Sequence, residues 1–219
     1  MLSNSSSPDN ETLREQPQPH PSTMGIAVWL VPSAEDAQRL KRIMDTRREE
    51  RSNHPSSYPS FHSHITLASL PLQSASPSEI RAAIPKFEHG LSVKFKSIEI
   101  GTHFFRSVYI AIELTPELSA LHDKIHAKLA IEPRTPAFPH VSLCYIADEA
   151  AREREEFFRE LKDGGKIRQI QNDSNVSINC AGGPGEEDWM SGFLAKEVWV
   201  AQCDGPVEDW TVLDKIPIA

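Results

Sequence analysis

The sequence lacks the features that mark disulfide-rich, metal-clustered and membrane-spanning proteins. Its 219 residues include only three cysteines, Cys144, Cys180 and Cys203, which are odd in number and show no C-x-x-C spacing. We therefore expect reduced, mostly buried thiols rather than a disulfide scaffold or a cysteine-based metal site. No run of about eighteen apolar residues occurs, which predicts no membrane span. Residues 1–23 have neither a basic start nor an apolar stretch, so we expect no secretory signal and predict a soluble, intracellular, cytoplasmic protein.

Positive charge is also scarce. The chain has 23 Lys and Arg against 31 Asp and Glu, a formal net charge of −8. Residues 1–23 hold Arg14 and three acidic residues, so 22 basic and 28 acidic side chains belong to the rest. A body of net charge −6 repels phosphate backbones at long range, and binding to long nucleic acid is not expected. A small phosphorylated ligand held by local donors remains compatible with this charge.

Composition divides the chain into a tail and a body. Residues 1–23 are rich in Ser, Pro, Gln and Asn, which predicts a disordered tail, and residues 24–219 are predicted to form a single domain. Apolar and alternating runs predict strands over residues 25–31, 61–71, 91–100, 107–114, 140–146, 167–171, 176–180 and 196–203. Capping residues and apolar spacings of three and four predict helices over residues 33–50, 76–85, 115–129 and 147–162.

The order of these elements repeats. The first half of the chain is predicted to run strand, helix, strand with a histidine, helix, strand, and the second half helix, strand with a histidine, helix, strand. This order predicts an α+β fold of two lobes related by a pseudo-twofold axis, each an antiparallel sheet with outer helices. We expect the two histidine strands to face one central cleft.

A histidine followed two residues later by a hydroxyl residue occurs four times. The four triplets are His20-Pro21-Ser22, His54-Pro55-Ser56, His64-Ile65-Thr66 and His140-Val141-Ser142. The first two contain proline and fall in the tail or in a polar loop, where no sheet orients the side chains. The last two fall inside predicted strands, where alternation places the histidine and the hydroxyl on one face.

Two such pairs, 76 residues apart, favour a shared site over core hydrogen bonding. Across a cleft, one imidazole of His64 and His140 can take a proton from attacking water while the other protonates the departing oxygen. Thr66 and Ser142 can donate hydrogen bonds to phosphate oxygens that carry charge in the transition state. The four side chains predict phosphoryl chemistry that requires no metal.

These residues resemble a known family. The paired motifs are similar to those of the two-histidine phosphoesterases, and more closely to the cyclic nucleotide phosphodiesterases of fungi and plants. The segments GIAVWLVP, SHITLASL, FPHVSLCY and EVWVAQCDGPVEDWTVLDKIPI resemble the fungal branch, from residue 25 to residue 218. The resemblance implies hydrolysis of 2′,3′-cyclic phosphates to 2′-phosphates without a cofactor. It also implies a substrate of tRNA splicing, ADP-ribose 1″,2″-cyclic phosphate, opened to ADP-ribose 1″-phosphate, and it leaves Golgi association open.

The resemblance also implies roles for individual residues. His64 and His140 correspond to the catalytic pair, with Thr66 and Ser142 as donors to the phosphate oxygens. We expect His140 to activate water and His64 to protonate the leaving oxygen. Tyr145 stands where the family has a tyrosine after its second motif and is expected to contact substrate, although strict alternation points it away from the His140 face. The plant branch has cysteine pairs near its site that this sequence lacks, so redox control is not implied.

Several other residues leave alternatives open. Arg106 can be a phosphate clamp with Phe104 or Phe105 as a stacking surface, or it can lie on the surface while a phenylalanine enters the core. Residues 182–192 can form a lid over the cleft or, as we favour, a plain connecting loop.

Three further histidines are interpreted as having no catalytic or metal-binding role. His62 is expected to be a strand-edge neighbour of His64. His122 and His126 have the i, i+4 spacing of two zinc ligands, but no third ligand is evident, and we expect both to face solvent.

The sequence therefore predicts a monomeric phosphodiesterase whose partner is a small cyclic-phosphate nucleotide. One alternative is a two-histidine phosphoesterase that acts on RNA ends. Another, from a different class, is a catalytically silent module that binds nucleotides.

Overall fold

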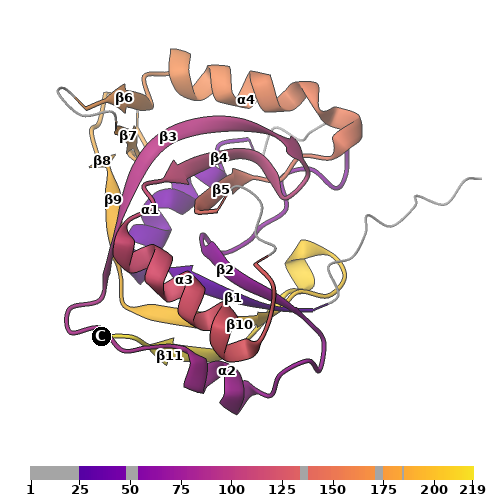
Figure 1. Ribbon diagram of the computed structural model, residues 1–219. Helices are drawn as coiled ribbons and strands as arrows, with labels where there is room; N and C mark the ends of the chain where they lie inside the picture. The colour runs from indigo at the N-terminus through magenta and orange to yellow at the C-terminus, as the bar shows by residue number, and fades with distance from the viewer. Residues whose placement is uncertain (1–24, 48–53, 134–137, 171–174, 184) are drawn as a thin grey trace, which may run out of the picture.

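A computed structural model describes residues 25–47, 54–133, 138–170, 175–183 and 185–219 (Figure 1). The helices are α1 (Ala34–Met44), α2 (Pro77–Ala83), α3 (Pro116–Leu129) and α4 (Arg152–Asp163), with the 3₁₀ turns η1 (Asp148–Ala150) and η2 (Val207–Asp209). The strands are β1 (Gly25–Val31), β2 (Ile65–Pro71), β3 (Leu91–His103), β4 (Arg106–Ile112), β5 (His140–Cys144), β6 (Ile167–Gln169), β7 (Val176–Asn179), β8 (Trp189–Met190), β9 (Gly192–Ala195), β10 (Glu197–Gln202) and β11 (Thr211–Pro217). The predicted tail lies outside the described residues, so the division into tail and single domain stays a prediction.

Two antiparallel sheets of four strands form the two lobes. The first has the order β11-β10-β1-β2, and the second has the order β5-β4-β3-β9. β2 and β5 are the edge strands of their sheets, and they contact each other where the lobes meet. A smaller sheet, β6-β7-β8, lies beside the second lobe (Figure 1). The predicted α+β fold with two antiparallel lobes is confirmed.

The lobes are not the two halves of the sequence, and this part of the prediction was wrong. The first sheet combines β1 and β2 with β10 and β11 from the end of the chain, while β3, expected in the first lobe, belongs to the second sheet. The cause lies in β1, which is buried at all seven positions. A strand so buried needs a paired neighbour on each edge, and β10 supplies the second one. β11 was not predicted, because most of its residues are exposed or half-buried.

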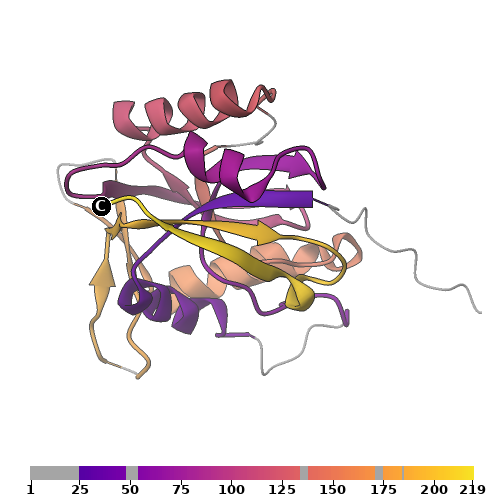
Figure 2. The same ribbon diagram turned by 90° about the horizontal axis from the view of Figure 1, so that it is seen from below.

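The helices tie the lobes together. α3 packs on β2 and against α2, whereas α4 packs on β3 and β4. α1 follows a strand of the first sheet but contacts β5 of the second. Figure 2 shows α2 and α3 on one side of the molecule and α1 and α4 on the opposite side. Each sheet is therefore covered in part by helices that the chain reaches after leaving the other sheet.

The helix starts follow the predicted capping chemistry. The Ser33 hydroxyl accepts the Asp36 N–H at the start of α1, and the Thr115 hydroxyl does the same for the Leu118 N–H at the start of α3. Ser76 and the third helical residue of α2 form a complete capping box. These local hydrogen bonds explain why the starts of α1, α2 and α3 were readable from sequence.

Several boundaries differ from the predicted ones. The helix expected over residues 33–50 ends at Met44, and its last three positions lie outside the described residues. The helix expected from residue 147 begins as the turn η1, and α4 starts at Arg152. β2 starts at Ile65, and β3 continues to His103 because its end still pairs with the start of β4.

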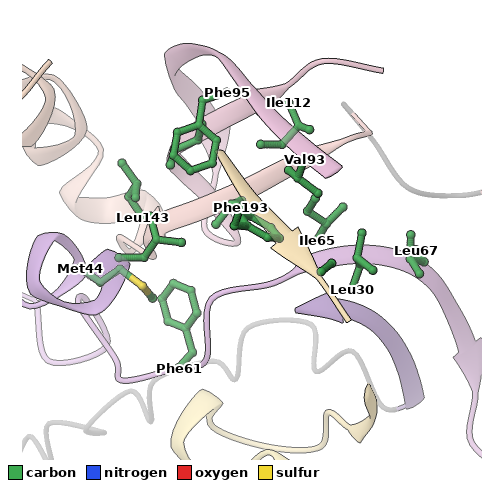
Figure 3. Close-up of a cluster of buried hydrophobic side chains, with 14 of the residues drawn as sticks. Leu30, Met44, Phe61, Ile65, Leu67, Val93, Phe95, Ile112, Leu143 and Phe193 are labelled. Carbon is green, nitrogen blue, oxygen red and sulfur yellow. The ribbon is translucent and has the colours of Figure 1, made fainter. Parts of the chain in front are cut away.

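The main core lies between the two sheets. Its residues come from both sheets, from all four helices and from the segment before β2, and Figure 3 labels ten of them: Leu30, Met44, Phe61, Ile65, Leu67, Val93, Phe95, Ile112, Leu143 and Phe193. A second cluster covers the opposite face of the first sheet and contains Ala27, Trp29, Val31, Ala201 and Cys203. All three cysteines are free and buried, as predicted. Within the described ranges, no helix is long and apolar enough to cross a membrane.

We expect Phe95→Ala to lower the free energy of unfolding by about 3–5 kcal/mol, because a fully buried ring leaves a cavity. Phe95 is 0% exposed, and its ring lies edge-on to that of Phe193 with centroids 6.3 Å apart. Urea unfolding measures the change. The control is Leu213→Ala, at a residue 48% exposed, which should shift stability by less than about 0.5 kcal/mol. Equal stability of the two variants would contradict the core placement of Phe95.

Candidate active site

A cavity of about 580 Å³ opens where the two sheets meet. The first sheet contributes β1, β2 and the segment after β10, and the second contributes β5 and the turn between β3 and β4. The lining residues are Gly25, Ile26, Ala27, Trp29, His64, Thr66, Ser69, Leu70, Pro71, His103, Phe105, Arg106, His140, Ser142, Tyr145, Cys203 and Trp210. All five residues predicted from the two motifs and their neighbourhood line this one cavity.

His64 is buried and held in one orientation. Its ring stacks on Trp29, with centroids 4.1 Å apart and planes at 17°, and it lies edge-on to Phe61. The Nδ1 atom lies 2.6 Å from the carbonyl oxygen of His62. Because a carbonyl only accepts, Nδ1 carries the hydrogen, and the neutral ring keeps its lone pair on Nε2.

Electrostatics keeps His64 uncharged in the free protein. Burial lowers the pKa of His64 to about 4 from its ordinary value of 6.5, and the nearby His140 acts in the same direction. The hydrogen bond to the carbonyl of His62 opposes this shift but does not reverse it. At neutral pH the His64 side chain is therefore a neutral base.

His140 approaches the cleft from the other lobe. It is half-buried and is the first residue of β5, paired with Ala111 of β4. The Tyr109 ring lies edge-on to the imidazole, with centroids 5.2 Å apart. Both imidazoles line one cavity, as predicted, but only His140 lies in a strand, because β2 begins one residue after His64.

The two hydroxyl residues lie on the cleft side of their strands. Thr66 is half-buried and pairs across the strands with Trp29, while the neighbouring Ile65 enters the core. Ser142 is 6% exposed, and its hydroxyl donates a hydrogen bond to the carbonyl of Phe105 at 2.9 Å. The proton of Ser142 is thus already engaged, so it must turn away from Phe105 to reach a ligand.

Tyr145 lies in the cleft, and the alternation argument that pointed it away was wrong. β5 ends at Cys144, so Tyr145 no longer follows the strand period. Its ring stacks on Phe61, with centroids 3.9 Å apart and planes at 6°. Burial raises the pKa of Tyr145, while a hydrogen bond with Ser142 acts in the opposite direction, so the phenol stays protonated.

The segment before β2 is fastened to the end of β5. The Tyr58 N–H donates to the carbonyl of Tyr145 at 2.8 Å, and the Ser57 hydroxyl accepts the Ala147 N–H at 3.0 Å. These bonds, together with the stacking of Phe61 on Tyr145, hold the segment that carries His64 against the second lobe.

Aromatic side chains form one wall of the cavity, and the sequence did not single out two of them. Trp210 lies 6.0 Å from Trp29 and 5.7 Å from Phe105, measured between ring centroids. Trp29 sits in an apolar strand and Trp210 at the end of η2, so no local pattern separates them from core residues. Phe105 and Arg106 line the cavity, and Phe104 and Phe105 both pack against the core. His103 is a further lining residue that no sequence motif singled out.

The expectation that His122 and His126 face solvent was wrong, because both are buried on α3. His126 donates from Nδ1 to the carbonyl of His122 at 2.8 Å, and the two rings lie 4.1 Å apart. His122 also packs on Phe138, and burial lowers its pKa. Among the residues that the structure describes, no group of three His, Cys, Asp or Glu side chains could hold a metal ion.

The prediction that residues 182–192 form a plain connecting loop was wrong in part, because strand residues lie within the segment. The described part of this segment includes β8 and the start of β9, and none of its residues lines the cavity. Asp188 instead pairs with Arg39 and Arg42 of α1. His62, expected at the strand edge beside His64, lies before β2; it is exposed, and its ring lies edge-on to Trp199.

Comparisons with known proteins agree with this geometry. Residues 24–218 match the family model described as cyclic phosphodiesterase-like protein. The cyclic phosphodiesterase of Arabidopsis thaliana is 27% identical over 122 residues, which are 54% of this chain and 64% of that relative. The aligned part therefore spans less than two thirds of the relative.

Solved structures share the fold. The apo form of E. coli LigT matches with a TM-score of 0.50 at 13% identity, over 89% of this chain and 96% of LigT. A structure described as a phosphoesterase matches with a TM-score of 0.51 at 14% identity, over 92% of this chain and 99% of that chain.

The two-lobed fold and the paired histidines define a two-histidine phosphoesterase. Because the family model covers nearly the whole body, the chain belongs to the cyclic phosphodiesterase-like family. The resemblance drawn from the two motifs is confirmed.

We expect His64→Gln to remove part of the acid sensitivity of the fold. Between pH 6.5 and 4 the unfolded chain protonates this histidine while the folded protein does not, so stability falls as the pH decreases through this window. The loss attributable to His64 is about 3 kcal/mol. Urea unfolding at several pH values measures it. His89→Gln, at an exposed histidine, serves as the control and should keep the wild-type pH dependence. An identical pH dependence in His64→Gln would contradict a depressed pKa.

Proposed function

We propose that this protein hydrolyses 2′,3′-cyclic phosphates to 2′-phosphates. The observation that carries the proposal is the convergence of two histidine and hydroxyl pairs, from separate sheets, on one cavity. In the reaction, water attacks phosphorus and loses a proton to one imidazole, while the bond to the 3′-oxygen breaks and that oxygen takes a proton from the other. After the reaction the histidine that acted as base carries an extra proton and the one that acted as acid has lost one. Proton exchange with solvent restores both.

The assignment of acid and base between the histidines stays a prediction, and the structure favours the reverse of the one drawn from sequence. His64 is neutral, with Nδ1 held by a carbonyl and the Nε2 lone pair available, which suits a general base. His140 would then protonate the leaving oxygen. A nucleotide substrate with a p-nitrophenyl ester distinguishes the two, because that leaving group needs no acid. It should restore turnover in the variant that lacks the acid and not in the variant that lacks the base.

A small nucleotide fits the rest of the cavity. The aromatic wall of Trp29, Phe105 and Trp210 offers stacking surfaces for a base. One solved E. coli LigT structure, with a TM-score of 0.50 at 14% identity, is a complex with 3′-AMP, so a protein of this fold holds a small nucleotide. We include ADP-ribose 1″,2″-cyclic phosphate among the proposed substrates, as the family resemblance implies. Each lobe of one chain supplies half of the site, which supports action as a monomer.

Turnover of adenosine 2′,3′-cyclic phosphate should fall by about 10²- to 10⁴-fold in both His64→Ala and His140→Ala, because each variant lacks one proton-transfer group. Phosphorus NMR of the product tests the proposal directly and should show the 2′-phosphate alone. The control is His89→Ala, which changes an exposed histidine outside the cavity and should keep wild-type turnover.

Near-wild-type turnover in either catalytic variant would refute the assignment, and turnover that collapses in excess EDTA would refute its metal-free chemistry. Binding of a nucleoside 2′-phosphate without turnover would favour the silent module. Faster hydrolysis of an RNA ending in a cyclic phosphate than of the mononucleotide would favour the activity on RNA ends.

The two hydroxyl residues should differ in their effect on the rate. Thr66→Val removes a phosphate-oxygen donor and should reduce kcat by about 10²-fold. Ser142→Ala should reduce kcat by only about tenfold, because the Ser142 hydroxyl exchanges its bond to the Phe105 carbonyl when it turns to the ligand. Steady-state kinetics on the same cyclic nucleotide measures both. A Ser142→Ala loss larger than that of Thr66→Val would contradict this ranking.

A further inference from the structure

Arg106 takes no part in the chemistry proposed above, although it lines the cavity. Among the described residues that form the lining, it is the only one with a permanent charge, and none is Asp or Glu. This is contrary to the composition of the chain, in which 31 acidic side chains outnumber 23 basic ones. The cavity is therefore a locally cationic site in an acidic protein, and its charge comes from one guanidinium.

The guanidinium of Arg106 has an unused donor. Its Nε atom is buried without a hydrogen-bond partner in the described part of the chain. No ion pair joins Arg106 to a carboxylate among the described residues. The guanidinium lies over the Tyr109 ring, whose centroid is 5.9 Å from the guanidinium carbon. A buried donor without an acceptor is costly, and an anionic ligand would remove that cost.

Tyr109 lies between this cation and His140. The same ring that contacts Arg106 lies edge-on to His140, at 5.2 Å between centroids. The guanidinium is thus one aromatic ring away from the catalytic imidazole. An anion bound by Arg106 would lie near the reacting phosphate without replacing it.

The turn that carries Arg106 is held firmly. A side chain at Gly101 would place its Cβ 1.8 Å from the Arg106 carbonyl oxygen, so only glycine lets β3 approach β4 so closely. The buried Ser107 hydroxyl donates to the carbonyl of Phe104 and accepts the Ile146 N–H, each at 2.9 Å. The guanidinium is thereby presented to the cavity from a backbone fixed on both sides.

We propose that Arg106 binds a second phosphate group of the substrate, at the 5′ position of a nucleoside 2′,3′-cyclic phosphate. The inference rests on the proposed function, which already gives the cyclic phosphate two imidazoles and two hydroxyls. A planar guanidinium with several donors matches the oxygens of a further phosphate. The 5′-oxygen lies one ribose away from the cyclic phosphate, which agrees with a cation set one ring away from His140.

The test compares adenosine 2′,3′-cyclic phosphate with the same nucleotide carrying a 5′-phosphate. Arg106→Gln should lower kcat/KM for the 5′-phosphorylated substrate by about 10- to 100-fold, the effect of losing a charge-assisted contact. That loss should be at least about tenfold greater than the loss for the unphosphorylated substrate. Arg106→Lys keeps the charge and should lose less. Arg159→Gln makes the same charge change on an exposed residue of α4 and should alter neither substrate.

Equal losses for the two substrates would overturn the proposal, because Arg106 would then act at the reacting phosphate. Wild-type kinetics of Arg106→Gln with both substrates would overturn it as well. Calorimetric binding of adenosine 2′,5′-bisphosphate and adenosine 2′-phosphate gives a readout without turnover, and Arg106→Gln should weaken only the bisphosphate. If that selective effect appears while the wild type hydrolyses neither cyclic nucleotide, the proposed function fails and the second-phosphate subsite stands.

Discussion

The arrangement of this molecule depends on the burial of β1 on both of its faces. One face enters the core between the sheets, and the other carries Trp29, on which His64 stacks. A strand with no exposed position must be paired on both edges, so β2 and β10 flank it. This single requirement brings the end of the chain back to its beginning. It also places Cys203 and Trp210, which follow β10, in the wall of the cavity between the two sheets.

The same burial determines the chemistry of His64. Trp29 and Phe61 exclude water from the His64 ring, and this makes the charged imidazole unfavourable. The carbonyl of His62 selects the tautomer. The partner imidazole sits on the other sheet, in a less buried place beside Tyr109. Two chemically identical side chains thus acquire different environments because they come from different lobes. This asymmetry is what a pair that both takes and gives a proton needs.

Charge is distributed differently over the chain and in the cavity. An acidic chain repels phosphate backbones at long range, while a cavity whose described lining holds no carboxylate is compatible with a small anion. In the proposed reaction the hydroxyls and imidazoles contact the reacting phosphate, and the cation of the lining, Arg106, is separated from His140 by the Tyr109 ring. Hydrogen bonds between the segment before His64 and the residues that follow β5 hold the two lobes together.

The sequence by itself determined the strands with regular alternation, the capped helix starts and the two pairs of histidine and hydroxyl, because these depend on spacing within a few residues. Alternation alone assigned His64, Thr66, His140 and Ser142 to the cleft-facing sides of their strands, and all four line the cavity. Only the tertiary structure decided which strands share a sheet, since the pairing of β1 with β10 joins residues far apart in the chain. It likewise decided that Tyr145 turns into the cleft where β5 ends, and that the histidines of α3 are buried. These features depend on how segments far apart in the chain pack against one another, and a pattern within a few residues does not determine that packing.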